Sequence, residues 1–60
     1  MGDFAEILNT HVGETILLKL NHDDLTAYKI ERVQDDCIVV TLGNVRRIIP
    51  FNKIEYVQES

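Results

Sequence analysis

Alternation between hydrophobic and polar residues predicts a chain made mainly of β-strands. Ile16, Leu18 and Leu20 share one face of an extended segment, because successive side chains of a strand point to opposite faces. Tyr28 and Ile30 share a face in the same way and are expected in the core. The pattern predicts five strands in all, at about residues 14–20, 26–33, 37–42, 45–49 and 53–57.

The last three strands are separated by two tight turns. Gly43-Asn44 is a two-residue hairpin signal, and Pro50 ends the fourth strand because proline cannot donate a hydrogen bond to a sheet. Phe51-Asn52 then forms a tight corner. Residues 37–42 are nearly all apolar, which predicts a strand buried on both faces and an inert core thiol at Cys37.

The first segment has the periodicity of a short amphipathic helix, over about residues 3–12. Asp3 and Glu6 have the spacing of a capping box with aspartate as N-cap, and Gly13 marks the expected end. The side chains that share one face of this helix are Phe4, Ile7, Leu8 and His11. A helix this short is marginal in water, so its apolar face is expected to pack on an open end of the strands.

Length and charge narrow the class of protein. The 60 residues form one domain, expected over 1–60, whose core is marginal without a disulfide, a metal or a partner subunit. Cys37 is the only cysteine, so association with further copies is the expected source of additional stability. The net charge of −4 restricts any contact with nucleic acid to a local basic patch.

The sequence gives no membrane signal. It has no apolar stretch of about 18 residues, so no transmembrane helix is expected. Its acidic start lacks the basic region of a signal peptide. Together with the single free thiol, these features predict a cytoplasmic protein without a membrane partner.

Candidate catalytic and metal-binding residues are few. His22, Asp23 and Asp24 have side chains that bind metals, but they lie in a short polar turn, so neither a metal nor another cofactor is expected. No nucleophile with its base, and no pair of carboxylates, forms a convincing catalytic set. The sequence therefore predicts a protein that is not an enzyme.

One helix and five short strands leave few topologies, because so short a sheet must curl to bury one face. The order resembles that of the Sm-like family, which includes bacterial RNA chaperones and short proteins of bacteria and their phages. The matching residues are Leu8, Val12, Gly13, Ile16, Leu17, Leu18, the segment 29–33, Ile38, Val39, Val40, Ile48, Ile49, Ile54 and Val57. SH3-like barrels share much of this pattern. The resemblance implies a mainly β fold, with a short N-terminal helix followed by a five-stranded, strongly bent antiparallel barrel.

The resemblance also implies self-association. In the Sm-like family the fourth strand of one subunit pairs with the fifth strand of the next, and the subunits close a ring. A homo-oligomeric ring of about five to seven copies is therefore expected, in which no strand edge stays open. The residues expected on the two edges are Val45, Arg47, Ile49, Ile54 and Tyr56. The alternative is a monomer whose N-terminal helix covers the apolar surface.

RNA binding is a further implication, although the motifs match only in part. Sm-like proteins that bind uridine-rich RNA carry an aspartate, a stacking side chain and an asparagine between the second and third strands. That loop is Gln34-Asp35-Asp36 here. The Arg-Gly pair that is common between the last two strands is replaced by Pro50-Phe51-Asn52. The family's standard RNA pocket therefore does not transfer directly.

The remaining candidates for weak binding of single-stranded RNA are Phe51, Asn52, Lys53, Arg46 and Arg47. Phe51 offers a ring for base stacking, Asn52 a base-reading amide, and Lys53 with one arginine a phosphate contact. In the alternative interpretation Phe51 packs beneath the corner, Asn52 caps the turn, and the arginines protect a strand edge. Alternation sends Arg46 and Arg47 to opposite faces. The alternative function is an acidic SH3-like module that binds protein and no nucleic acid.

Overall fold

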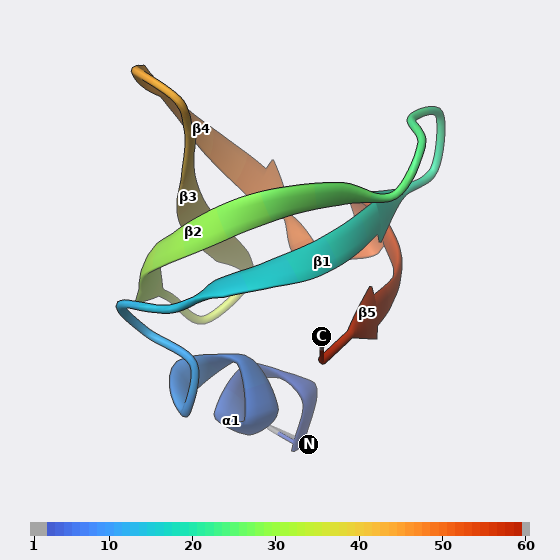
Figure 1. Cartoon of the computed structure of the whole chain (residues 1–60). Helices are drawn as coiled ribbons and strands as arrows, with labels where there is room; N and C mark the ends of the chain where they lie inside the picture. Colours follow the sequence, from blue (N-terminus) through green and yellow to red (C-terminus); the bar gives the residue numbers. More distant parts are fainter. Residues whose placement is uncertain (1–2, 60) are drawn as a thin grey trace.

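A computed structural model describes residues 3–59 as one short helix followed by five strands (Figure 1). The elements are α1 (Asp3–Asn9), β1 (Thr15–Leu20), β2 (Thr26–Val33), β3 (Cys37–Leu42), β4 (Val45–Pro50), the one-turn 3₁₀ helix η1 (Phe51–Lys53) and β5 (Ile54–Gln58). The predicted mainly β fold with an N-terminal helix is confirmed.

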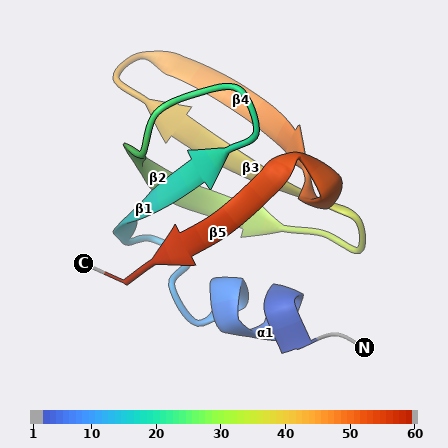
Figure 2. The ribbon, with the colours of Figure 1, turned by 90° about the vertical axis from the view of Figure 1, so that its right-hand side faces the viewer.

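All five strands belong to one strongly bent antiparallel sheet, in the order β4-β3-β2-β1-β5 (Figure 2). Register shifts at Lys19/Leu20 and at Ile30/Arg32 mark two irregularities, which increase local twist and help the sheet bend. Within residues 3–59, β4 and β5 do not pair, so the sheet is not closed into a barrel. They form its two edges, because β5 leaves η1 to run along β1 rather than back along β4.

The core lies on the concave side of the bent sheet. Tyr28 is 1% exposed and sits among aliphatic side chains, as its place in the alternating pattern predicts. The buried cluster consists of Leu8, Ile16, Leu18, Leu20, Tyr28, Ile30, Ile38, Val40 and Ile49. Val33, Phe51, Ile54 and Val57 pack around it. The inward residues of every strand therefore meet in one core.

Helix α1 covers one open end of this core (Figure 1) and is shorter than predicted. Its Leu8 is fully buried among the strands. The helix ends at Asn9 rather than near residue 12, because the next residues form tight turns in which the N–H of His11 donates to the carbonyl of Leu8 (3.0 Å). Gly13, with φ of 90°, then donates to Ile30 on β2 (2.8 Å) and brings the chain into β1.

Strand β3 is buried on both faces only at its centre. Ile38 and Val40 face the core, while Val39 is buried on the opposite face beside Ile48 of β4. Cys37 is half-buried rather than a core thiol, because it lies on the outer face where β3 begins. Pro50 is still part of β4, paired with Cys37, so the strand ends one residue later than predicted.

Candidate functional site

The loop between β2 and β3 and the corner between β4 and β5 lie side by side. The N–H of Phe51 donates to the carbonyl oxygen of Asp36 (3.0 Å). Gln34 closes its own loop, since its N–H donates to Cys37 (2.9 Å) and its side-chain oxygen accepts from the Cys37 thiol (3.3 Å). Gln34, Asp35 and Asp36 are all exposed. The structure thus brings together the two segments that sequence analysis singled out.

Phe51 is half-buried at this corner. Its ring meets Phe4 of α1 edge-on, with centroids 5.5 Å apart, and it packs against the core cluster. This geometry matches the interpretation in which Phe51 packs beneath the corner. Asn52 is exposed and its carbonyl accepts a hydrogen bond from the side chain of Asn21 (3.3 Å). Base stacking by Phe51 would require the ring to leave Phe4.

Arg46 and Arg47 point to opposite faces of β4, as alternation predicts. Arg46 lies opposite Thr41 on the outer face, whereas Arg47 lies opposite Val40 on the concave face. The guanidinium of Arg47 donates to the hydroxyl of Tyr28 (2.9 Å). The two arginines therefore belong to different surfaces.

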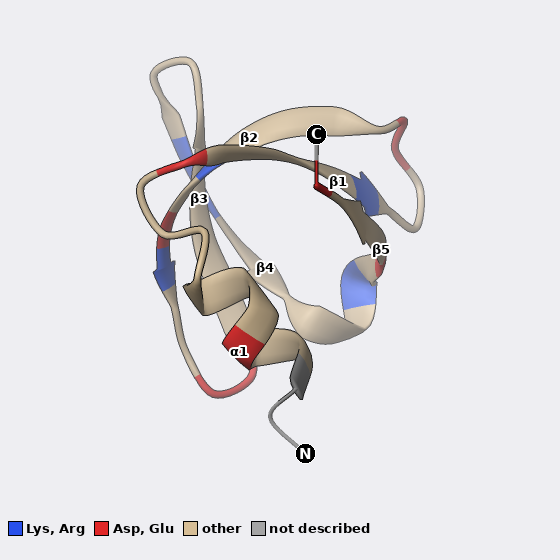
Figure 3. Ribbon diagram, turned by 60° about the horizontal axis from the view of Figure 1, so that its bottom comes forward, with Lys and Arg blue, Asp and Glu red and all other residues tan. Residues whose placement is uncertain are grey.

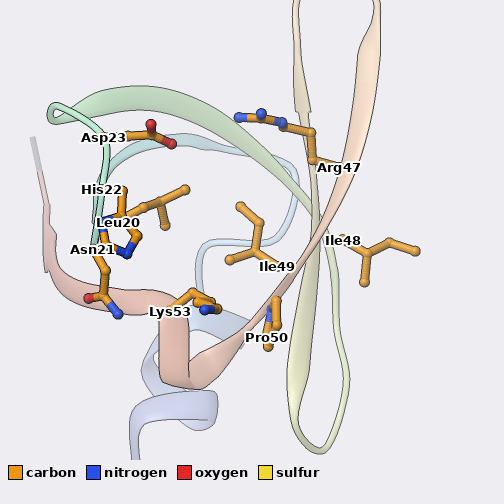
Figure 4. A pocket seen from close by; sticks show the side chains of 9 residues that line it. All are labelled: Leu20, Asn21, His22, Asp23, Arg47, Ile48, Ile49, Pro50 and Lys53. Carbon is orange, nitrogen blue, oxygen red and sulfur yellow. The ribbon is translucent and has the colours of Figure 1, made fainter.

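A pocket of about 290 Å³ opens where β4 separates from the turn between β1 and β2 (Figure 4). The residues that line it are Leu20, Asn21, His22, Asp23, Arg47, Ile48, Ile49, Pro50 and Lys53. Figure 4 shows Ile49 pointing into the pocket and Ile48 pointing away from it. Two cationic side chains and one histidine thus share a pocket with a single carboxylate, in a chain of net charge −4.

This pocket joins Arg47 and Lys53, which sequence analysis proposed together, and omits Arg46, Phe51 and Asn52. Sequence analysis considered His22 only as a metal ligand in a polar turn and did not single out Asn21 of the same turn. Their contribution depends on the hydrogen bond from the N–H of Asn21 to the carbonyl of Lys53 (2.9 Å), which the local sequence does not signal.

Both edges of the sheet expose apolar side chains. On β4, Ile48 is 67% and Val45 59% exposed, and on β5, Tyr56 is 48% exposed. Ile49, expected at the interface, instead belongs to the core, because its register opposite Ile38 turns it inward. Ile54 is half-buried against the core as well. Ile48 therefore replaces Ile49 as the accessible β4 isoleucine.

A second hollow lies between α1 and β5, lined by carboxylates as well as apolar side chains. Its lining residues are Phe4, Ile7, Glu55, Tyr56, Val57 and Glu59. The helix therefore lies beside the open edge of β5 and does not cover Tyr56. Sequence analysis expected the apolar face of α1 to pack on an open end of the strands, with a helix that covers the apolar surface of a monomer as the alternative.

Charge is divided between strands and turns (Figure 3). Basic side chains lie on β1, β2, β4 and η1, while most acidic ones lie on α1, β5 and the turns. Strand β2 contains one acidic residue, Glu31, and its carboxylate accepts a hydrogen bond from the hydroxyl of Thr41 (2.7 Å). Over residues 3–59, no group of three or more His, Cys, Asp or Glu side chains is placed to hold a metal ion.

The thiol of Cys37 is held in its protonated form. Burial raises the pKa of Cys37, and the negative charge of the neighbouring Asp36 raises it further. Because the thiolate is the nucleophile, this environment disfavours cysteine chemistry.

His11 ties the C-terminal end of the chain to the turn after α1. Its Nε2 lies 2.7 Å from a carboxylate oxygen of Glu59, and its Nδ1 lies 3.0 Å from one of Glu14. The hydrogen bonds to Glu14 and Glu59 raise the pKa of His11 above its ordinary value of 6.5. Protonated His11 donates to both carboxylates, and this holds the residue after β5 in place.

We expect this contact to make stability depend on pH. Because the folded-state pKa of His11 is raised, its contribution is fully present below about pH 6.5 and is lost as pH rises through the folded pKa. Urea unfolding at several pH values will show a stability difference between the chain and a His11→Gln variant that shrinks as pH rises. A difference that grows with pH would contradict this.

The described residues contain no helix that is long and apolar enough to cross a membrane. No protein-family model, curated protein or solved structure matches the chain.

Proposed function

We propose that this chain is a non-enzymatic Sm-like protein that assembles into a homo-oligomeric ring by pairing β4 of one copy with β5 of the next. The observation that carries the proposal is the pair of open sheet edges, which expose Val45 and Ile48 on β4 and Tyr56 on β5. Unpaired edges with exposed apolar residues readily add another strand.

The charges of the two edges favour β4 with β5 over either strand with itself. β4 carries Arg46 and Arg47 and no acid, whereas Glu55 and Glu59 lie in or directly after β5, which has no lysine or arginine. Pairing two β4 strands would bring four arginines together. Glu55 and Glu59 also have partners within the chain, Lys19 (3.0 Å) and His11, so charge contributes more to partner choice than to affinity.

Such a contact uses a different surface on each copy. Contacts of this head-to-tail kind close into a ring when the rotation per copy divides a full turn, and they then leave no edge exposed. A 60-residue chain buries little apolar surface in its own core, and assembly would bury more of it between copies.

Native mass spectrometry at micromolar concentration tests this proposal. We expect a single closed oligomer of about five to seven copies. A monomer at all concentrations would overturn the ring and leave the acidic SH3-like module that binds protein as the better proposal.

Single-stranded RNA is a second proposed ligand, supported by the contact between the β2–β3 loop and the β4–β5 corner at Asp36 and Phe51. Against it stand the acidic loop and the packed Phe51 ring. A gel shift with oligouridine at low salt, where phosphate contacts are strongest, is expected to show weak binding. No shift under these conditions would remove RNA from the proposal.

A further inference from the structure

The pocket between β4 and the β1–β2 turn has the features of a site for a small anion. Arg47 and Lys53 enter it from β4 and η1, and His22 enters it from the turn (Figure 4). We propose that this pocket binds the phosphate group of a small phosphate monoester. All the residues that it uses belong to one copy, but four of them lie on β4, the edge that the proposed ring would cover, so the site is also tested in a variant that cannot assemble.

The side chain of Arg47 is positioned by a hydrogen bond that leaves most of its donors free for a ligand. Its guanidinium donates to the hydroxyl of Tyr28 (2.9 Å), and Tyr28 is fixed in the core. A guanidinium has five N–H donors, so most of them remain for a ligand. Among the described residues, neither Arg47 nor Lys53 forms an ion pair with an acid. Within residues 3–59, neither charge is therefore paired with a carboxylate at ion-pair distance.

Hydrogen bonds connect the β1–β2 turn, on one side of the pocket, to η1 on the other. The N–H of Asn21 donates to the carbonyl of Lys53 (2.9 Å), and the Asn21 side chain donates to the carbonyl of Asn52 (3.3 Å). These bonds hold the β1–β2 turn against η1, so the backbone positions that carry His22 and Lys53 keep a fixed spacing. A preformed arrangement lowers the entropy lost when a ligand binds.

The lining chemistry matches a phosphate that carries an organic group. A phosphate monoester has a second pKa of about 6, so it is largely a dianion at neutral pH and suits two cations. The planar arginine and the compact lysine charge are common phosphate ligands. Leu20, Ile49 and Pro50 add an apolar wall for the organic part. The volume of about 290 Å³ lies at the lower end of the range for ligand pockets, which limits the ligand to a small molecule.

Asp23 allows a second test of the proposed phosphate site. Its carboxylate is the only acid in the lining and opposes an anion. In Figure 4 the head group of Arg47 points toward the side of the pocket where Asp23 lies. Asp23→Asn should therefore tighten phosphate binding, while removing a cation should weaken it.

The test is a titration of the ¹⁵N-labelled chain with uridine monophosphate, inorganic phosphate and uridine, followed by NMR. We expect the amide signals of residues 20–23, 47–49 and 51–53 to shift with uridine monophosphate, less with phosphate, and not with uridine. Arg47→Gln should weaken binding roughly tenfold, the effect of losing one charge-assisted hydrogen bond. Arg46→Gln, which removes the neighbouring charge from the other face, is the matched control and should leave binding within about twofold.

Four results would overturn the proposal. They are the absence of shifts at millimolar ligand, equal weakening by Arg46→Gln and Arg47→Gln, equal binding of uridine, and binding of oligouridine without binding of the monophosphate. The last would assign these residues to RNA instead. Repeating the titration with Tyr56→Asp, which blocks the β5 edge outside the pocket, separates ligand binding from assembly.

Discussion

Ile48→Asp is expected to convert the assembled chain into a folded monomer. Ile48 is 67% exposed on the outer face of β4, so a charged side chain there leaves the core of one copy intact. In the assembly the new carboxylate would lie at the interface with β5, whose Glu55 is also negative. Burying an unpaired charge and losing a central apolar contact should cost at least about 2 kcal/mol per interface, or roughly thirtyfold in affinity.

Sedimentation velocity measures this change directly, and circular dichroism shows whether the sheet persists. Val12→Asp is the matched control, because Val12 is also an exposed aliphatic residue but lies in the turn after α1 and on neither edge strand. We expect Val12→Asp to keep the size of the unmodified chain. Equal dissociation by both variants would show that general acidity, rather than the β4 edge, controls assembly.

Leu8→Ala is expected to remove much of the stability of a single copy. Leu8 is fully buried beneath α1, and truncation of such a leucine costs about 2–5 kcal/mol through lost burial and the cavity left behind. A domain of this length has a free energy of unfolding of roughly 3–9 kcal/mol. The variant should therefore unfold at much lower urea concentration, with α1 leaving the open end of the core.

Ile7→Ala is the control for this change, because Ile7 is the neighbouring helical residue and is 48% exposed. Its effect should stay near about 0.5 kcal/mol. Both substitutions are best measured in the Ile48→Asp background, where assembly does not add to stability. Similar losses for the two variants would contradict the role of Leu8 as the residue that fixes α1 to the sheet.

The strands were predictable because burial of one face imposes a period of two residues. The predicted bounds of β2 and β3 match the structure at both ends, since alternating or continuous apolar runs are flanked there by polar turns. The helix was predicted too long because its pattern continues to His11. That side chain faces Glu14 and Glu59 instead, in a turn set by the contact between Gly13 and Ile30.

The candidate site was less predictable, because it depends on contacts between distant segments. Alternation correctly separated Arg46 from Arg47, which is a local property of one strand. Alternation did not show that Phe51 would pack on Phe4, nor that the N–H of Asn21 would donate a hydrogen bond to the carbonyl of Lys53. The sequence likewise indicated two edge strands without showing that Ile49 turns inward and Ile48 outward, because that follows from the register with β3.

The most direct test of the central claim, that β4 of one copy pairs with β5 of another, is to mix two variants with different blocked edges. Ile48→Asp blocks β4 and Tyr56→Asp blocks β5, so each alone should be a monomer. In an equal mixture, the intact β5 of the first should pair with the intact β4 of the second. The only edges then left are blocked, so sedimentation at high concentration should show a one-to-one dimer and nothing larger. A mixture that stays monomeric, or either variant forming a dimer by itself, would contradict head-to-tail pairing of these edges.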